Sequence, residues 1–193
     1  MSMHDPKSGI AYGPKVYNDA AVNQMHDTQD PLVTYAASKV LAEKAFWEGE
    51  TPFVRNSVLP DFTMGPAVDD KLRSSTHEWL RGTFHNDEGA IGVMKMLPYQ
   101  WWVNVQDVAR LHVGAAIFEE VQNKRLLGFV ESYNLDQFID TMHELDPERK
   151  LIDKEWADSD NSTADTKDAR EVLKLFGRDG FIGYEETIKA NLA

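Results

Sequence analysis

Residues 30–48 of this chain read DPLVTYAASKVLAEKAFWE, and they carry the strongest structural signal in the sequence. Asp30 is a favourable N-cap and Pro31 suits the first helical position, while the alanines, leucine and lysines that follow favour a helix. Gly49 is typical of the position just after a helix end. The stretch therefore predicts one helix that begins at Pro31 and ends close to Gly49.

Tyr35 and Lys39 are four residues apart in this helix, so they share one face, one turn apart. A free phenol has a pKa of about 10 and is a poor acid or base near neutrality. A neighbouring ammonium favours the phenolate and lowers that pKa toward the range where proton transfer is useful. The pair is therefore a catalytic candidate. The alternative, from the residues alone, is that Tyr35 packs while Lys39 stays solvated.

Four segments in order along the chain resemble one known family. They are residues 30–48, 58–66 (VLPDFTMGP), 102–113 (WVNVQDVARLHV), and the C-terminal segments 165–173 and 185–188 taken together. They resemble the extended short-chain dehydrogenase/reductases, especially the fungal carbonyl reductases that act on aldehydes, ketones and methylglyoxal, and their dihydroflavonol-reductase relatives. The resemblance covers the chain from about Tyr17 to the end.

The resemblance implies a reaction and roles for two residues. Hydride passes from the nicotinamide C4 to a substrate carbonyl carbon, and Tyr35 gives the proton to the carbonyl oxygen. Lys39 binds the nicotinamide ribose and depresses the pKa of Tyr35. The resemblance favours NADPH over NADH as the cofactor, and a small-molecule carbonyl compound as the substrate.

The resemblance also implies further cofactor contacts beyond the Tyr–Lys pair. They involve the loop after a strand, at Pro60, Phe62 and Thr63, and a hydroxyl cluster that includes Ser75. From the residues alone, Pro60 could simply end a strand, and Ser75 could be a helix N-cap.

A dinucleotide site needs a strand, a glycine-rich turn and a helix whose N-terminus holds the pyrophosphate. Residues 1–29 contain turn-rich sequence and read as a loop-rich lead-in. Gly177, Gly180 and Gly183 have the right spacing, but a helical segment precedes them, so Gly177 reads as a helix C-cap. We expect the chain to be the C-terminal portion of a longer reductase and to be inactive alone. The hydroxyl that the family uses beside Tyr35 is Ser2 or, preferably, an upstream serine.

Composition sets limits on function. The 193 residues suit one domain over 1–193, and a net charge of -12 argues against nucleic acid and anionic membranes as partners. The chain has no cysteine, which excludes disulfides and thiolate metal sites and fits a cytoplasmic protein. Its histidines show no ligand spacing, so no metal site is predicted. No apolar run is long enough to span a membrane.

Strand-like and helix-like segments alternate along the chain, which predicts a parallel sheet. We expect strands at 53–59, 101–105 and 125–130 and helices at 75–84, 107–119 and 134–144, the second of them capped by Asp107. Two short C-terminal helices and loops at 61–71, 87–92 and 158–166 complete the chain. The predicted fold class is α/β: a partial Rossmann-like parallel sheet, the C-terminal half of one, with a small α-helical substrate-binding region. That region spans about 61–100 and 131–193.

The sequence thus predicts an NAD(P)H-dependent oxidoreductase that reduces a small aldehyde or ketone. Two alternatives stay open: an epimerase/dehydratase, which uses the same Tyr–Lys pair, and a truncated, non-catalytic protein. An apolar substrate pocket would be walled by Met64, Phe84, Tyr99 and one of Trp101 and Trp102, which face opposite sides of a strand. Such apolar walls speak against sugar nucleotides. Uncovered strand edges would make the truncated chain self-associate.

Overall fold

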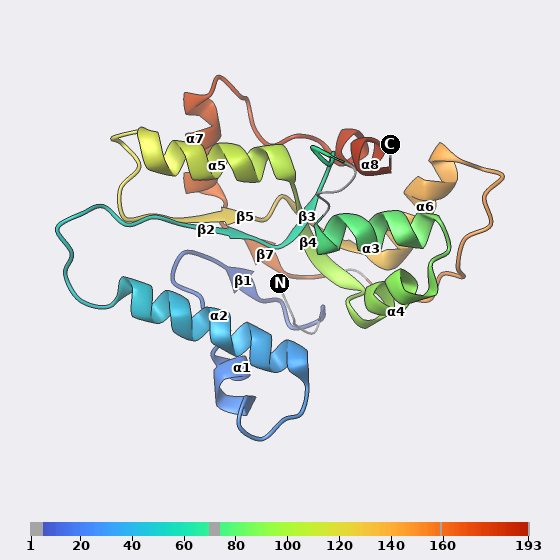
Figure 1. The fold of residues 1–193 in the computed structure, drawn as a ribbon, viewed down its shortest axis with the longest axis horizontal. Helices are drawn as coiled ribbons and strands as arrows, with labels where there is room; N and C mark the ends of the chain where they lie inside the picture. The colour runs from blue at the N-terminus through green and yellow to red at the C-terminus, as the bar shows by residue number, and fades with distance from the viewer. Residues whose placement is uncertain (1–5, 70–73, 159, 193) are drawn as a thin grey trace.

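The structure is a computed structural model that describes residues 6–69, 74–158 and 160–192. Figure 1 shows the arrangement of its helices and strands. In chain order these are β1 (Ala11–Tyr12), α1 (Asp19–Gln24), α2 (Pro31–Trp47), β2 (Ser57–Pro60), β3 (Phe62–Met64), α3 (Ser75–Phe84), α4 (Glu88–Met96), β4 (Tyr99–Asn104), α5 (Val105–Ile117), β5 (Arg125–Gly128), β6 (Glu131–Asn134), α6 (Leu135–Leu145), β7 (Thr163–Ala164), α7 (Lys167–Leu175) and α8 (Tyr184–Leu192).

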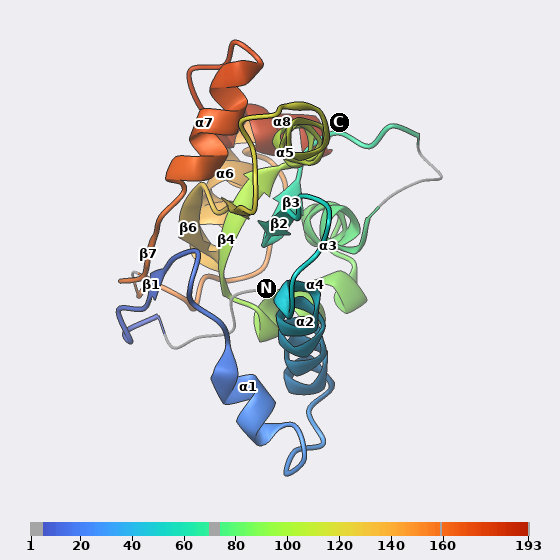
Figure 2. The same ribbon diagram turned by 90° about the vertical axis from the view of Figure 1, so that its left-hand side faces the viewer.

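The strands lie between two groups of helices. Figures 1 and 2 show α5, α7 and α8 on one side of the strands and α1 and α2 on the other, with α3 and α4 toward the far end. The strand pairs β2–β5, β3–β4 and β1–β7 are parallel, and β4–β6 is antiparallel. The predicted α/β class, with small parallel sheets, is confirmed.

Strands β2 and β3 are separated by Asp61 alone and bridge two of the small sheets. Val58 in β2 is the register partner of Leu126 in β5, and Thr63 in β3 is the partner of Val103 in β4. In the described part of the chain, no strand pairs with the other edge of β2. This strand therefore ends its sheet, with α2 below it and α5 above it (Figure 2).

Two apolar cores and a third, three-residue cluster of Trp101, Leu127 and Phe129 hold the layers together in the described part of the chain. The larger core packs β3, β4 and β6 against α3, α6 and α8, and it includes Phe62, Trp102, Tyr133 and Phe138. The smaller core lies between α5, α7 and β5. At Gly114 in α5 an added Cβ would lie 2.5 Å from Cγ1 of Val172 in α7, so only glycine allows this close approach.

The predicted Tyr–Lys helix is α2, and both of its predicted ends are confirmed. The carboxylate of Asp30 accepts a hydrogen bond from the Leu32 N–H at 2.8 Å, which satisfies one of the unpaired donors of the first turn. Pro31 is the first helical residue, and Gly49 has a φ of +71° just past the end. The helix buries little of its own surface, and α1 is its main packing neighbour.

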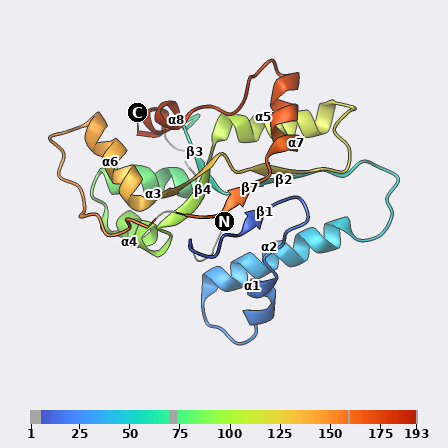
Figure 3. The ribbon, with the colours of Figure 1, turned by 180° about the vertical axis from the view of Figure 1, so that it is seen from behind.

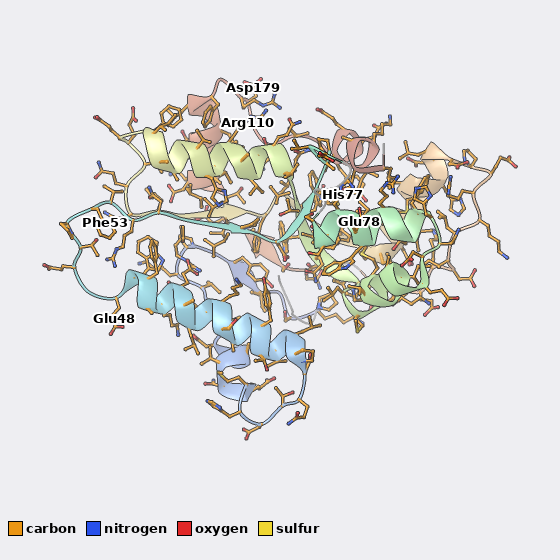
Figure 4. The ribbon with its side chains drawn as sticks, viewed as in Figure 1. Glu48, Phe53, His77, Glu78, Arg110 and Asp179 are labelled. Carbon is orange, nitrogen blue, oxygen red and sulfur yellow. The ribbon has the colours of Figure 1, made fainter. Side chains whose placement is uncertain are left out.

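The strand expected at 53–59 begins later than predicted, at Ser57. Phe53, labelled in Figure 4, is 63 % exposed on the connection from α2 and belongs to no strand. Arg55 points back to the end of α2, where its guanidinium donates hydrogen bonds to the carbonyl oxygens of Phe46 at 2.7 Å and Gly49 at 2.9 Å. Arg55 therefore caps the helix, and residues 53–56 do not extend the strand.

Two expected loops contain regular structure. Within 61–71, β3 forms because Phe62 and Met64 both point into the larger core; residues 70–71 lie outside the described ranges. Within 87–92, the turn-forming residues are a helix start, since the Asp87 carboxylate accepts a hydrogen bond from the Ala90 N–H at 2.8 Å and begins α4. Turn-forming residues also cap helices, so this prediction was wrong for a physical reason.

The helix expected at 107–119 is α5, and its cap is Asn104 instead of Asp107. Asp107 is fully buried; its carboxylate accepts a 2.6 Å hydrogen bond from the Ile182 N–H and pairs with Arg110 at 2.7 Å. Figure 4 shows Arg110 on this helix. Asp107 thus ties the loop before α8 to α5.

The lead-in over 1–29 was predicted to be loop but contains β1 and α1. The polar loop predicted at 158–166 contains β7, which pairs in parallel with β1. Figure 3 shows this strand pair from behind, near the N-terminal end of the described chain. Two-residue strands of this kind give no sequence periodicity, so the pairing could not be predicted from residues 6–29 alone.

The helices expected at 75–84 and 134–144 are α3 and α6, and both short C-terminal helices are present.

Candidate active-site cleft

A cleft of about 890 Å³ opens between α2 and β2. Its three walls combine segments that are distant in sequence. They are the inner face of α2 (including Tyr35, Ala36, Lys39, Val40, Glu43 and Phe46), residues 56–60 with Arg125 and Phe129, and the N-terminal segment (Ile10, Tyr12 and residues 16–20).

Tyr35 and Lys39 both line this cleft, one helical turn apart. The Lys39 ammonium lies over the aromatic ring of Tyr35, 5.3 Å from the ring centre, which is a cation–π distance. Tyr35 is 50 % exposed, so its phenol is open to solvent and to a ligand. Among the described residues, no carboxylate forms an ion pair with Lys39. The pair that the sequence singled out is thus brought together in a cavity of ligand size.

Pro60, the last residue of β2, also lines the cleft. The cleft runs along the whole of β2, and at Pro60 it reaches the carboxyl ends of β2 and the parallel β5, where ligands of open α/β sheets bind. Helix α2 and strand β2 run in opposite directions (Figure 1), so the first turns of the helix lie on the side of this strand end. Three of the predicted site residues therefore share one cavity.

Phe62, Thr63 and Ser75 do not line this cleft. Phe62 is almost fully buried in the larger core, and the carbonyl oxygen of Thr63 accepts a 2.6 Å hydrogen bond from the Thr76 hydroxyl. Ser75 is the exposed first residue of α3. The helix cap is its neighbour Ser74, whose hydroxyl accepts from the His77 N–H at 3.2 Å. Ser2, a candidate for the hydroxyl that the family uses beside Tyr35, lies outside the described residues.

A carboxylate and a guanidinium form the strongest polar contact of the cleft wall. Glu43 Oε1 accepts from Arg125 Nε, and Glu43 Oε2 accepts from Arg125 Nη2, both at 2.8 Å. The Ser57 hydroxyl donates to Glu43 Oε1 at 2.8 Å. Burial raises the pKa of Glu43, but the hydrogen bonds from Arg125 and Ser57, together with the Arg125 charge, outweigh it and hold this pKa below its ordinary value. Glu43 is thus a structural carboxylate, ionised at neutral pH.

The aromatic wall of the cleft differs from the one that the sequence suggested. Trp102, Met64 and Phe84 pack in or against the larger core, and neither Trp101 nor Tyr99 lines the cleft. The aromatic side chains that do so are Tyr12, Tyr17, Tyr35, Phe46 and Phe129. Tyr12 and Tyr17 were missed because the lead-in read as loop; their two rings in an otherwise polar segment were the available signal.

The glycine-rich segment near the C-terminus is a helix end, as predicted. Gly177 has a φ of +70°, its N–H donates to the Lys174 carbonyl at 2.8 Å, and the Arg178 N–H donates to the Leu173 carbonyl at 3.2 Å. This paired pattern closes α7.

Residues 6–69, 74–158 and 160–192 contain no group of acidic or histidine side chains placed to hold a metal. None of the helices in those ranges is long and apolar enough to cross a bilayer.

Comparison with known proteins gives relatives but no matching family model. The chain is 37 % identical over 163 residues to the NAD-dependent epimerase/dehydratase terH of Aspergillus terreus, covering 79 % of this chain and 46 % of that protein. It is 32 % identical over 170 residues to aldehyde reductase 2 of Sporidiobolus salmonicolor, covering 84 % and 49 %. The chain thus spans about half the length of the curated relatives it matches.

Solved structures show the same fold at lower identity. Gre2 of Candida albicans in complex with NADPH matches with a TM-score of 0.75 and 20 % identity, covering 96 % of this chain and 58 % of that one. Vestitone reductase from alfalfa matches with a TM-score of 0.70 and 18 % identity, covering 96 % and 58 %. Over most of its length, the chain is homologous to the C-terminal part of the extended short-chain dehydrogenase/reductases.

Proposed function

We propose that this chain supplies the Tyr–Lys half of the active site of an NADPH-dependent reductase acting on a small aldehyde or ketone. The observation that carries the proposal is the single cleft that Tyr35, Lys39 and Pro60 line together, which reaches the carboxyl end of β2. Curated relatives named aldehyde reductase 2 and ketoreductase adrE support a carbonyl substrate. As a single domain over 1–193, with its loop-rich lead-in at 1–29, the chain would form the C-terminal portion of a Rossmann-type, cytoplasmic reductase.

In this proposal the nicotinamide cofactor supplies the hydride, and the residues of this chain bind, orient and move a proton. Tyr35 donates its phenolic proton to the carbonyl oxygen, and Lys39 binds the nicotinamide ribose and stabilises the phenolate that forms. The Lys39 ammonium, which forms no ion pair with any carboxylate of the described residues, and the half-exposed Tyr35 phenol fit such a cofactor, because both can donate to ligand oxygens. Of the further cofactor contacts that the family resemblance implies, Pro60 lines the cleft, whereas Phe62, Thr63 and Ser75 lie outside it.

The competing reaction is that of an epimerase/dehydratase. The relatives terH and tndE carry that name, so the name alone does not decide between the reactions. The cleft wall favours the reductase: Tyr12, Val16, Phe46 and Phe129 present apolar surface, whereas a sugar nucleotide needs many partners for its hydroxyl groups.

The experiment is a chimera in which the part of aldehyde reductase 2 that precedes its matched segment is fused in front of residue 17 of this chain. Carbonyl reduction is followed as loss of NADPH absorbance with a panel of small aldehydes and ketones, and UDP-glucose turnover is measured in parallel. NADPH-dependent reduction supports the proposal. Turnover of UDP-glucose alone supports the epimerase/dehydratase, and a folded chimera without either activity supports a non-catalytic protein.

A further inference from the structure

We propose that the ion pair of Glu43 and Arg125, here called the clasp, is a positioning device that sets the distance between α2 and β2. It thereby fixes the width of the cleft at Tyr35 and Lys39. Its effect on hydride transfer rests on the proposed function, whereas its effect on the position of α2 does not.

Apolar packing does not fix the position of α2. Only Ala37 and Val40 are buried along its length, and Leu41 and Phe46 are each 43 % exposed. The cleft of about 890 Å³ separates its inner face from β2, where a closely packed helix would have none. A helix that is separated from its sheet by a cleft needs specific contacts to fix its distance from the sheet and its angle to it.

The clasp is such a contact, because it joins α2 directly to the first residue of β5. Both carboxylate oxygens of Glu43 are used in a two-point fork with Arg125, and Oε1 also accepts from the Ser57 hydroxyl of β2 and from the Trp47 indole N–H of α2. The two charged side chains are only 16 % and 9 % exposed, so solvent screens the pair less than a surface ion pair. The planar fork fixes orientation as well as distance.

The same guanidinium also holds the third wall of the cleft. Arg125 Nη1 donates to the carbonyl oxygens of Pro14 at 3.0 Å and Val16 at 3.1 Å. The guanidinium lies 4.1 Å from the ring centre of Tyr17. One side chain therefore ties the N-terminal segment, α2 and β5 together. Lysine could keep the charge but could not reproduce this set of planar donors.

The clasp acts on the reactive pair through the helix itself. Glu43 lies one turn after Lys39 and two turns after Tyr35 on the same face of α2. Arg55 holds only the last turn, through the carbonyl oxygens of Phe46 and Gly49. Because Arg55 still holds the last turn of α2, loss of the clasp would let the first turns of α2 tilt. Tyr35 would move more than Lys39, because it lies farther from Arg55 along the helix.

The test measures the position of α2 without any activity. The chain has no native cysteine, so spin labels can be placed at the exposed positions Ser38 in α2 and Ala116 in α5 by paired cysteine substitutions. Double electron–electron resonance then gives the distance between the two labels, from α2 to α5 across the strands. We expect one narrow distribution in the wild-type background, and a shifted or broadened one in Arg125→Lys and in Glu43→Gln. Lys44→Gln, which breaks the exposed ion pair between Lys44 of α2 and Asp19 of α1, should leave the distribution unchanged.

Near-UV circular dichroism identifies the folded variants. If Arg125→Lys fails to fold, the distance measurement is made on Glu43→Gln instead. Unchanged distances in a folded clasp variant would overturn the inference. In the chimera, a 1 Å misplacement of the reactive pair predicts a loss of kcat on the order of 10²-fold in Arg125→Lys. Shifted distances in an inactive chimera would refute the proposed function alone. Unshifted distances in an active chimera would refute the clasp alone.

Discussion

The ammonium of Lys39 lies over the ring of Tyr35, 5.3 Å from its centre, and both side chains face one cleft. Their spacing of one helical turn brings them together, and the clasp at Glu43 holds the helix that carries them. The arrangement places a phenol and a cation on the side of the carboxyl end of a parallel strand, where open α/β sheets bind their ligands. Several consequences can be measured on the 193-residue chain.

This chain alone should bind NADPH weakly or not at all. The described residues contain no strand–glycine-rich turn–helix unit, so the backbone donors that hold a pyrophosphate are missing from them. Isothermal titration of the purified chain with NADPH checks this. A dissociation constant in the low-micromolar range would show that residues described here suffice for the cofactor.

Acid should weaken the fold through Glu43. Its pKa is lower in the folded chain than its ordinary value, so the stabilisation is complete above the ordinary value and disappears as the pH falls through the lower, folded one. Urea unfolding between pH 7 and pH 3 should therefore show a smaller loss of stability in Glu43→Gln than in the wild type. Glu120→Gln, at an exposed position, controls for the removal of one negative charge. Equal losses in the Glu43 and Glu120 variants would contradict the prediction.

Two glycine-to-alanine changes in helices should have opposite effects. In Gly114→Ala the new methyl would lie 2.5 Å from Cγ1 of Val172 and 3.1 Å from Phe176, so the free energy of unfolding should fall by about 1–3 kcal/mol. In Gly92→Ala, within α4, nothing lies within 4 Å of the added Cβ. Helix propensity should raise that free energy by about 0.5–1 kcal/mol. Chemical denaturation measures both, and a neutral Gly114→Ala would refute the tight α5–α7 contact.

The isolated chain should self-associate more strongly as salt increases. The outer edge of β2 pairs with no strand in the described residues, and such edges recruit other chains. Repulsion from the net charge of -12 opposes association, and salt screens that repulsion. Light scattering across a salt series tests this, with Leu59→Lys expected to reduce association and Leu175→Lys as the control away from the edge. A monodisperse monomer at every salt concentration would contradict it.

The sequence predicted the fold best where a local signal was strong. Asp30, Pro31 and Gly49 mark the ends of α2, and the predicted bounds of α3 are those found. The errors came from residues with two uses. Asp87 reads as a turn residue but caps α4, and Asp107 reads as a cap but is a buried acceptor for the Ile182 N–H.

For the site, helical spacing was enough to pair Tyr35 with Lys39. Nothing in the sequence places Arg125 beside Glu43, because the two are 82 residues apart and meet only when β5 and α2 pack near each other. The cleft wall from the lead-in depends in the same way on contacts between Arg125 and the carbonyl oxygens of Pro14 and Val16. Long-range polar contacts of this kind carry no periodicity, so single-sequence patterns do not reveal them.

The most direct test of the central claim is the rate of NADPH-dependent carbonyl reduction by the chimera and its Tyr35→Phe variant, with Tyr99→Phe as the control. Phenylalanine keeps the ring under the Lys39 ammonium but removes the proton donor. We predict a loss of kcat of about 10²- to 10⁴-fold in Tyr35→Phe with NADPH binding retained, and no comparable loss in Tyr99→Phe. Near-wild-type turnover by Tyr35→Phe would show that Tyr35 is not the proton donor and would contradict the account.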